Sequence, residues 1–365
     1  MSFETILPFL VSFVVSLGVT PLTIWLYRKK KWLDDPSAKK HPKHIHSTPL
    51  PRGGGIPVFA GIFLAALLFL PVDKHLVGIL AGALVLLITG ILDDVYDLTP
   101  KLRLGIGLVA ASMVVAAGIG IPFLSNPFSS SLIYLNEPQI PLYLFGKIRT
   151  IWILADMFAI FWIVGIMNFV NWSKGLDGQL PGMVGVAALI IAILSQRFSA
   201  DITQWATEIL ALIVAGAYFG FLPWNFFPQK IMPGYGGGSL AGYFLAVLAI
   251  LSTTKVGTLT IVLGVPLIDA VFVIFRRIFS GQSPLWGDTR HLHHSLLRLG
   301  WSKRRIAFFY WGITTVLGVI ALKLNSQQKL YTIVLLTVAL GALWLWIKQF
   351  GKLSSPPDPD SGSKT

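Results

Sequence analysis

Long apolar runs separated by short polar segments make up most of the chain. A helix needs about 20 mostly apolar residues to cross a bilayer. Eleven runs come near that length, at roughly 5–26, 54–71, 76–92, 104–122, 151–169, 182–196, 208–222, 239–252, 256–275, 306–323 and 330–349. The first run has no small-residue cleavage site after a short apolar core, so we expect it to stay as an anchor. The pattern predicts an all-α fold, a polytopic bundle of about eleven transmembrane helices.

Composition agrees with a membrane protein and excludes other classes. The 365 residues are 54% hydrophobic and 12% charged, with a mean hydropathy of +0.72, whereas about 25% charged residues are typical of soluble domains. The absence of cysteine excludes a disulfide scaffold and a Cys-ligated metal site. The basic residues behind the net charge of +13 lie between apolar runs. Membrane orientation and anionic phosphates explain them better than a nucleic-acid partner.

The basic residues also predict an orientation. When alternate loops are assigned to opposite sides, 22 of the 29 Lys and Arg residues fall on one side and 7 on the other. The basic side should be cytoplasmic, which places the N-terminus outside and the C-terminus inside the cell inner (plasma) membrane. Residues 1–351 are predicted to form one integral membrane domain. Residues 352–365, rich in Ser, Pro and Asp, are predicted to be a disordered cytoplasmic tail.

Five polar segments fall on the predicted cytoplasmic face: 34–55, 93–103, 168–178, 223–239 and 286–294. Alternate loops share a side by construction, so their position alone carries little weight. Their content differs, however, because the loops of the opposite face are short or contain few acids. We therefore expect the five segments to build one composite site.

The segment 93–103 starts with Asp93, Asp94 and Asp97 directly after an apolar run. Carboxylates at the end of a membrane helix are costly unless they are paired, hydrated or metal-bound. If the helix continues, Asp93 and Asp97 lie on one face. Hard oxygen ligands of this kind suit Mg²⁺ together with substrate phosphate. A solvated helix end is the alternative, and the third acid favours the metal.

The segment 168–178 carries two amides and a glycine turn. Asn168 and Asn171 are three residues apart and should face the same cavity. Gly175 and Gly178 permit a tight turn that holds Asp177 between them. An ordinary turn is the alternative.

The segment 286–294 contains Arg290, His291, His293 and His294. Several hydrogen-bond donors with positive potential favour a pyrophosphate or sugar-phosphate site. Zinc is a weaker alternative, because no cysteine assists and the three imidazoles do not share one helical face.

Two further segments combine basic residues with glycine. His46 and Arg52 precede the second apolar run, and Gly53–Gly55 stand at its start, where backbone N–H groups could face an anion. Helix packing and lipid headgroups are the alternatives for these residues. The segment 223–239 contains Lys230 and a glycine run but no carboxylate.

Taken together, these segments resemble the polyprenyl-phosphate N-acetylhexosamine-1-phosphate transferases, integral membrane enzymes of the glycosyltransferase family 4 type. The matching stretches are His46-Ser-Thr-Pro-Leu-Pro-Arg-Gly-Gly-Gly, Asp93-Asp94-Val-Tyr-Asp97, Asn168-x-x-Asn171 with Gly175-Leu-Asp-Gly178, Asn225-Phe-Phe-Pro-Gln-Lys230 with Gly237-Gly-Ser-Leu240, and Asp288-Thr-Arg-His-Leu-His-His294. They follow the family's order. The short His-Leu-His-His form is more similar to the bacterial hexosamine-phosphate branch than to the phospho-MurNAc-pentapeptide branch.

The resemblance implies a reaction at the cytoplasmic face. A UDP-N-acetylhexosamine would give its sugar-1-phosphate to undecaprenyl phosphate, releasing UMP, for cell-wall or polysaccharide synthesis. Mg²⁺, or Mn²⁺ in its place, would be the cofactor. The resemblance leaves open whether the chain forms a homodimer. The roles that it implies are catalysis by Asp93, Asp94 and Asp177, metal binding by Asp94, Asp177 and Asn171, and substrate binding by His46, Arg52, Asn168, Asn171, Lys174, Lys230, Arg290, His291, His293 and His294.

Two departures from the family pattern affect the metal. Lys174 stands where the family's Asp-Gly-x-Asp-Gly motif has its first Asp, and Tyr235 or Gly236 stands where another metal-binding Asp is usual. We expect weaker Mg²⁺ binding, and we hypothesise that the Lys174 ammonium replaces metal charge near the diphosphate. A member with lost or altered transfer, which still binds lipid phosphate or nucleotide, is the alternative.

A secondary transporter is the alternative from another class. Asp269 lies within an apolar run, as acids of ion pathways do, or it pairs with Arg276 or Arg277. The other acids gather in loops on one face, which disfavours a transporter.

Overall fold

Helices dominate the computed structural model, which describes residues 3–36, 48–129, 131–144, 147–197, 202–252, 255–281 and 291–350. The helices are α1 (Phe3–Lys30), α2 (Gly55–Phe69), α3 (Lys74–Tyr96), α4 (Pro100–Ala116), α5 (Ile153–Trp172), the 3₁₀ turn η1 (Ser173–Gly175), α6 (Gln179–Gln196), α7 (Ile202–Asn225), α8 (Gly234–Leu251), α9 (Lys255–Val262), α10 (Gly264–Phe279), α11 (Leu292–Arg298), α12 (Lys303–Ala321) and α13 (Ser326–Phe350). The predicted tail 352–365 lies outside the described residues.

The predicted polytopic helical bundle is confirmed, and each of the eleven predicted runs falls on helix. The count of eleven spans is not confirmed. Among the described residues, seven helices are long and apolar enough to cross a membrane, or eight if α9 and α10 form one span. The helix α2 has 15 residues, α4 has 17, and α12 begins with three basic residues.

The ninth predicted run is broken in the structure. Its two helices, α9 and α10, meet at an angle of 87°. Pro266 lacks the N–H that would bond to the carbonyl of Val262, where α9 ends, and its ring disfavours a continuous helix there. The bend directs α10 away from the line of α9.

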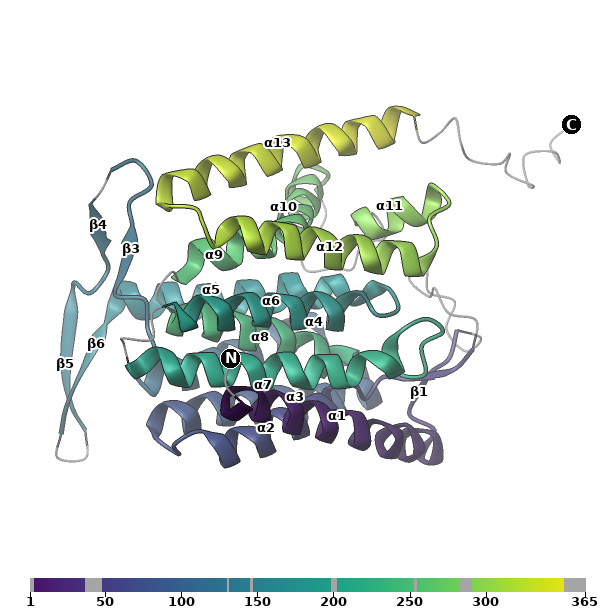
Figure 1. Cartoon of the computed structure of the whole chain (residues 1–365), viewed down its shortest axis with the longest axis horizontal. Helices are drawn as coiled ribbons and strands as arrows, with labels where there is room; N and C mark the ends of the chain where they lie inside the picture. The colour runs from purple at the N-terminus through teal and green to yellow at the C-terminus, as the bar shows by residue number, and fades with distance from the viewer. Residues whose placement is uncertain are drawn as a thin grey trace, which may run out of the picture.

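Three antiparallel two-stranded ribbons are additions to the predicted all-α fold. They pair β1 (Leu33–Asp34) with β2 (Leu50–Pro51), β3 (Phe123–Ser125) with β4 (Leu132–Tyr134), and β5 (Gln139–Leu144) with β6 (Lys147–Trp152). The last two ribbons connect α4 to α5 at one end of the bundle, and β1 lies at the other end (Figure 1).

The helix α8 is the centre of the bundle, and nearly all of its side chains are buried. Its first turn packs closely against α2 and α3 because glycines stand at the contacts. A Cβ on Gly90 of α3 would overlap the backbone of Gly236, and a Cβ on Gly55 of α2 would meet the same backbone. Small residues let membrane helices approach closely, which matters because lipid provides no hydrophobic drive for their association.

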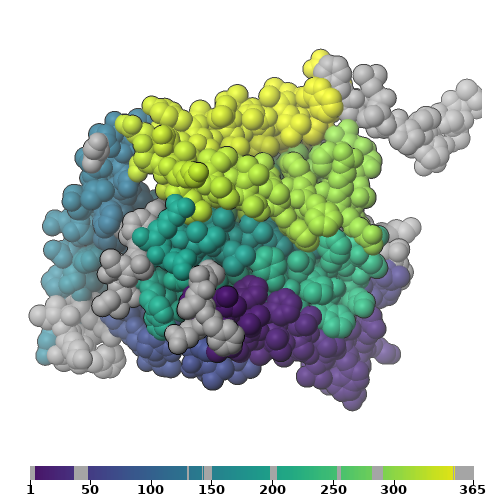
Figure 2. All heavy atoms as spheres, in the orientation of Figure 1, coloured from purple at the N-terminus to yellow at the C-terminus, as the bar shows by residue number. Residues whose placement is uncertain are grey.

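The outermost helix is α13, which lies along one edge of the molecule (Figure 2). Only 11% of the residues in its 18-residue apolar stretch are buried, and Val334, Leu335 and Val338 are exposed. A soluble monomer rarely leaves such a surface uncovered, so this face fits contact with lipid.

The glycine contact between α3 and α8 yields a stability prediction. Gly90→Ala should lower the free energy of unfolding by about 1–3 kcal/mol, as overpacking does, because the added methyl group meets the Gly236 backbone. Thermal unfolding of the purified protein in detergent measures this. The matched control is Gly165→Ala in α5, because a Cβ at Gly165 meets nothing within 4 Å. This substitution should be neutral or should stabilise the protein by up to about 1 kcal/mol. Equal effects of the two changes would contradict the packing argument.

Candidate active site

Asp93, at the C-terminal end of α3, is a fully buried carboxylate between two arginines. The Arg103 Nε lies 2.6 Å from Asp93 Oδ1, and the Arg52 Nη2 lies 3.6 Å from Asp93 Oδ2. The backbone N–H of Leu98 donates to Oδ1 at 3.2 Å. Asp97 ends the helix with φ of 52°, and its carboxylate lies 3.2 Å from Arg103 Nη2. The helix does not continue through Asp97, so the predicted shared helical face is absent. Arg103 joins the two carboxylates instead.

Asp94 lies beside the same arginine and a tyrosine from α1. The Tyr27 hydroxyl donates to Asp94 Oδ2 at 3.1 Å, and the Arg52 Nε lies 3.7 Å from Asp94 Oδ1. Asp93 Oδ2 and Asp94 Oδ1 are buried and have no hydrogen-bond partner, and both face Arg52. The guanidinium of Arg52 thus bridges the two acids.

Lys174, from η1, reaches the start of α8. Its Nζ donates to the carbonyl of Gly234 at 2.9 Å and lies 5.8 Å from the centre of the Tyr235 ring. The Arg103 guanidinium lies 5.4 Å from the same ring, whose hydroxyl donates to the Arg103 carbonyl at 3.3 Å. The two departures from the family pattern are therefore neighbours in space. Tyr235 supplies the side chain there, whereas Gly236 packs its backbone against α2 and α3.

Asp177 ties its own segment to the loop after α7 and to the start of α12. Lys303 Nζ donates to Asp177 Oδ1 at 3.2 Å, and the N–H of Gln229 donates to Oδ2 at 3.3 Å. The predicted turn is present, with Gly178 at φ of 74° and its N–H bonded to Asn225 Oδ1 at 3.0 Å. The segments 168–178 and 223–239 meet as expected.

The histidine segment is anchored by Asp269 of α10. The His291 Nδ1 lies 2.7 Å from Asp269 Oδ2, and the N–H of Leu292 donates to Oδ1 at 2.9 Å. His293 is buried, its ring stacks 5.6 Å from that of His291, and it packs against Gly175, next to Lys174. The structure thus assigns Asp269 a partner that the sequence did not suggest, since an arginine on its own helix or an ion pathway was expected.

The remaining predicted residues have other surroundings. Asn168 Nδ2 donates to the carbonyl of Val164 in its own helix at 2.8 Å, and Lys230 Nζ lies 5.1 Å from the centre of the Trp224 ring. Asn171 Oδ1 is buried against Gly238 without a hydrogen-bond partner. The ring of His294 lies 4.3 Å from that of His293. His46 and Arg290 lie outside the described residues.

In the glycine run Gly53–Gly55, the middle residue, Gly54, is packed against neighbouring backbone. The N–H of Gly54 donates to the carbonyls of Arg52 and Met232 at 2.9 and 3.1 Å. A Cβ at Gly53 would meet the Tyr27 ring. The packing interpretation therefore holds for Gly54, in place of an N–H directed at an anion.

The sequence analysis did not identify three side chains of this region: Tyr27, Arg103 and Lys303. Arg103 is the one arginine of the acidic segment 93–103, and charge balance could have identified it. Tyr27 and Lys303 carry no local signal, because their partners are 67 and 126 residues away.

The donor set can be compared with what Mg²⁺ requires. An octahedral Mg²⁺ takes oxygen ligands, usually one or two carboxylates with water and phosphate. Of the predicted ligands, Asp94 faces Arg52 and Tyr27, and Asp177 faces Lys303. Within the described parts of the chain, no group of three His, Asp or Glu residues could hold a metal ion. The third predicted ligand, Asn171 Oδ1, is buried without a hydrogen-bond partner and is a single neutral oxygen. Because both predicted carboxylate ligands are paired with basic side chains, the arrangement does not fit a divalent cation, and the N–H groups of Arg52, Arg103 and Lys174 fit an anion better.

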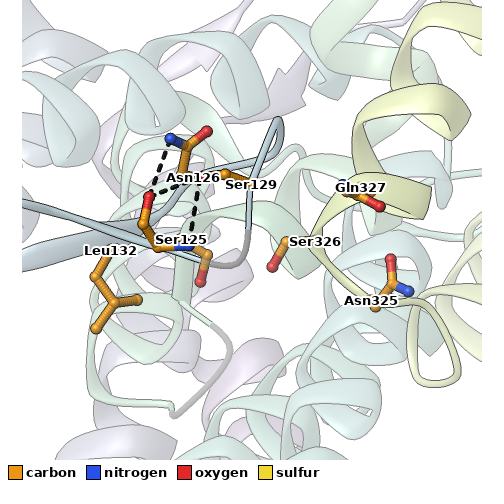
Figure 3. A pocket seen from close by; sticks show the side chains of 8 residues that line it. Ser125, Asn126, Ser129, Leu132, Asn325, Ser326 and Gln327 are labelled. Atoms are coloured by element: carbon orange, nitrogen blue, oxygen red, sulfur yellow. Dashed lines mark hydrogen bonds between the residues drawn. The ribbon is translucent and has the colours of Figure 1, made fainter.

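A separate pocket lies at the opposite end of the bundle. Its volume is about 260 Å³, between the β3–β4 ribbon and the turn from α12 to α13 (Figure 3). The lining consists of Ser125, Asn126, Ser129, Ser131, Leu132, Asn325, Ser326 and Gln327. None of these side chains is ionisable, so the pocket lacks the charges of the acid cluster.

Comparison with known proteins gives a consistent picture. The family Glycosyl transferase family 4 matches residues 76–253, which run from α3 to α8. The chain is 31% identical to a probable undecaprenyl-phosphate N-acetylglucosaminyl 1-phosphate transferase of Bacillus subtilis, over 88% of this chain and 85% of that protein. It is 28% identical to the decaprenyl-phosphate N-acetylglucosaminephosphotransferase of Mycobacterium leprae, over 74% and 72%. It is also 28% identical to the phospho-N-acetylmuramoyl-pentapeptide-transferase of Enterococcus faecalis, over 87% and 98%.

The burial of His293 yields a prediction on pH. Burial, with the neighbouring His294 and His291, lowers the pKa of His293 well below its usual value. As pH falls below about 6.5, this histidine binds a proton in the unfolded chain but stays unprotonated in the folded chain. The free energy of unfolding therefore decreases toward acid pH. His293→Gln should reduce this loss by up to about 1.4 kcal/mol per pH unit.

Thermal unfolding between pH 7.5 and pH 5.5 measures the effect. His75→Gln is the control, because His75 is partly exposed at the other end of α3, and it should retain the acid sensitivity of the wild type. Identical pH profiles for wild type and His293→Gln would contradict the prediction.

Proposed function

The chain belongs to the polyprenyl-phosphate N-acetylhexosamine-1-phosphate transferases of glycosyl transferase family 4, and on this basis we propose that it transfers an N-acetylhexosamine 1-phosphate from a UDP-sugar to undecaprenyl phosphate, with release of UMP. The observation that carries the proposal is the cluster of Asp93 and Asp94 with Arg52, Arg103 and Lys174. These residues come from four separate stretches of the chain.

The proposed reaction exchanges one bond to phosphorus for another. An oxygen of the lipid phosphate attacks the phosphorus that bears the sugar, and the bond from that phosphorus to the UMP oxygen breaks. Asp94 takes the proton of the lipid phosphate when that phosphate arrives protonated, and UMP leaves with the bond electrons. Catalysis of such a step consists mainly of aligning the two phosphates and neutralising their charge.

The cluster suits both tasks. Arg52 and Arg103 are held in place by the acids themselves, so their N–H groups need little reorganisation when a phosphate binds. The acids also stop the three cations from repelling one another. The N–H groups that the acids leave unused can donate to phosphate oxygens.

The histidine segment completes the donor side of the proposal. His293 is uncharged near neutral pH because its pKa is lowered. Asp269 fixes the orientation of His291 through Nδ1, which leaves Nε2 as the nitrogen for a ligand. Nε2 donates to a phosphate oxygen in the doubly protonated ring. We assign the donor's diphosphate to these imidazoles, next to the Lys174 segment.

We place this site at the cytoplasmic face of the inner (plasma) membrane. The proposal rests on the excess of Lys and Arg in the loops that contain the acids. A polyprenyl chain would stay in the bilayer while its phosphate reaches the helix ends at the water boundary.

Mg²⁺, or Mn²⁺, remains a separate proposal for an ion that enters with the donor's diphosphate. Asp94, Asp177 and Asn171 would be its contacts, and the ion would neutralise phosphate charge. The observed pairing of both acids with basic side chains does not favour it. No step above depends on the ion.

A second candidate function is binding without transfer. The observation that favours it is the presence of Lys174 and Tyr235 where the family pattern has carboxylates. In that case lipid phosphate or nucleotide binds, and UMP is not released.

A transfer assay tests the proposal. Purified protein in detergent should release UMP from UDP-N-acetylglucosamine only when undecaprenyl phosphate is present. Asp94→Asn should lower the rate by about 10²- to 10⁴-fold, as expected for the loss of a general base. Asp73→Asn is the matched control, because Asp73 caps the opposite end of α3, and it should keep the wild-type rate. Lipid-dependent release that survives Asp94→Asn would disprove the assignment, and binding without release would favour the second candidate.

The Asp269–His291 pair yields a further prediction. Asp269→Asn should lower the transfer rate by about 10²-fold, the cost of a small misplacement of a reacting group. If Asp269 acts through His291, the variant Asp269→Asn with His291→Asn should be no slower than the slower single variant. Multiplicative losses in the double variant would show that the two residues act separately.

A further inference from the structure

We infer that Lys174, together with Arg52 and Arg103, supplies the positive charge that holds a substrate phosphate at the acid pair, so that this chain binds its phosphate ligand without a divalent cation. The inference rests on the proposed function and specifies how its site binds phosphate. It follows from the charges, the hydrogen bonds and the Tyr235 ring at the cluster.

The first argument is the balance of charge. Two buried acids, Asp93 and Asp94, contact the guanidinium groups of Arg52 and Arg103. Lys174 bonds to Gly234, which lies against Asp94. Each acid is already next to a guanidinium, so a divalent cation would have to displace Arg52 or Arg103 and then face the remaining cations. A third acid, the exposed Asp97, also pairs with Arg103, so the formal charges of the cluster balance. A phosphate meets the opposite situation from a metal ion, because it accepts from Lys174 and from the guanidinium N–H groups that the acids leave unused.

The second argument is the unused capacity of Lys174. An ammonium group has three N–H donors. Within the described residues, Lys174 makes one hydrogen bond, to the carbonyl of Gly234. The other two N–H donors have no partner among the described residues and are left for a ligand. Charge-assisted hydrogen bonds from an ammonium to phosphate oxygens are short and strong.

The third argument is that the position of Lys174 is built into the fold. The Tyr235 ring has Lys174 and Arg103 at 5.8 and 5.4 Å from its centre, distances at which cations are attracted to an aromatic face. The Tyr235 hydroxyl bonds to the Arg103 backbone, which fixes the ring. A carboxylate in place of Tyr235 would pair with Lys174 and withdraw the ammonium from a ligand.

The neighbouring backbone supports this geometry. Gly234 has φ of +65°, and a side chain on it would collide with the Arg52 carbonyl and approach Asp94. The start of α8 therefore lies directly against the acid pair, and the carbonyl that accepts from Lys174 belongs to this same residue. Lys174, Tyr235 and Gly234 act as one unit beside the acids.

The ligand class is a phosphate monoester or diphosphate, and two sources carry that group: the polyprenyl phosphate and the UDP-sugar. The test uses both probes separately, undecaprenyl phosphate in detergent and UDP-N-acetylglucosamine in buffer. Binding to the full purified chain is measured with excess EDTA and again with excess Mg²⁺. For at least one probe, the Kd should be the same in both conditions.

The variants test whether Lys174 is responsible. Lys174→Ala should weaken that Mg²⁺-independent binding by about tenfold or more, as expected for the loss of a hydrogen bond between charged groups, and Lys174→Arg should retain most of it. The double variant Lys174→Asp with Tyr235→Asp should bind only with Mg²⁺. Lys329→Ala is the control, since Lys329 bonds to Thr258 away from the cluster. Thermal unfolding of each variant confirms that it is folded.

The outcomes separate this inference from the proposed function. Wild-type binding that disappears in EDTA, or binding unchanged in a folded Lys174→Ala, would overturn the inference. If lipid-dependent UMP release is still observed with Mg²⁺, the proposed function survives that result. If neither probe binds in either condition, both fail. An effect of Lys174→Ala on one probe alone supports the inference and assigns Lys174 to the acceptor or the donor phosphate.

Discussion

Two carboxylates buried side by side at the end of a membrane helix need compensating charge, and the architecture of this end of the protein follows from that need. Asp93 and Asp94 receive it from Arg52, Arg103 and the Tyr27 hydroxyl, which come from different segments. Removing either acid's partners would leave an uncompensated buried charge. The ends of α1, α2, α3 and α4 are therefore constrained to meet at one place.

That meeting requires the backbones to approach more closely than side chains allow. Gly90 of α3 and Gly55 of α2 contact the first turn of α8 at Gly236, and Gly234 lies against Arg52 and Asp94. The same turn presents the carbonyl that binds Lys174 and the ring of Tyr235. Glycine packing, a structural device for membrane helices, thus also determines which cations surround the acids.

A second anchored region adjoins the first. The broken helix pair α9 and α10 carries Asp269 to the histidine segment, and His293 rests on Gly175, one residue from Lys174. Asp177 and Lys303 join the start of α12 to the same loop. Charged side chains within or next to apolar helices here serve to fix loops, in agreement with a membrane enzyme whose polar groups gather at one boundary.

The sequence by itself determined the helical membrane fold, the positions of the apolar runs and the family, because hydrophobicity over 15 to 25 residues and short motifs are local properties. It also predicted that Asp93, Asp177 and the histidines belong to segments that meet. The tertiary structure alone decided which charges pair: Arg103 with Asp93, Lys303 with Asp177 and Asp269 with His291. It likewise decided the bend between α9 and α10 and the three β-ribbons. The physical reason is that the choice of an ion-pair partner depends on which backbones approach each other, and residues up to 126 positions apart are brought together only by packing.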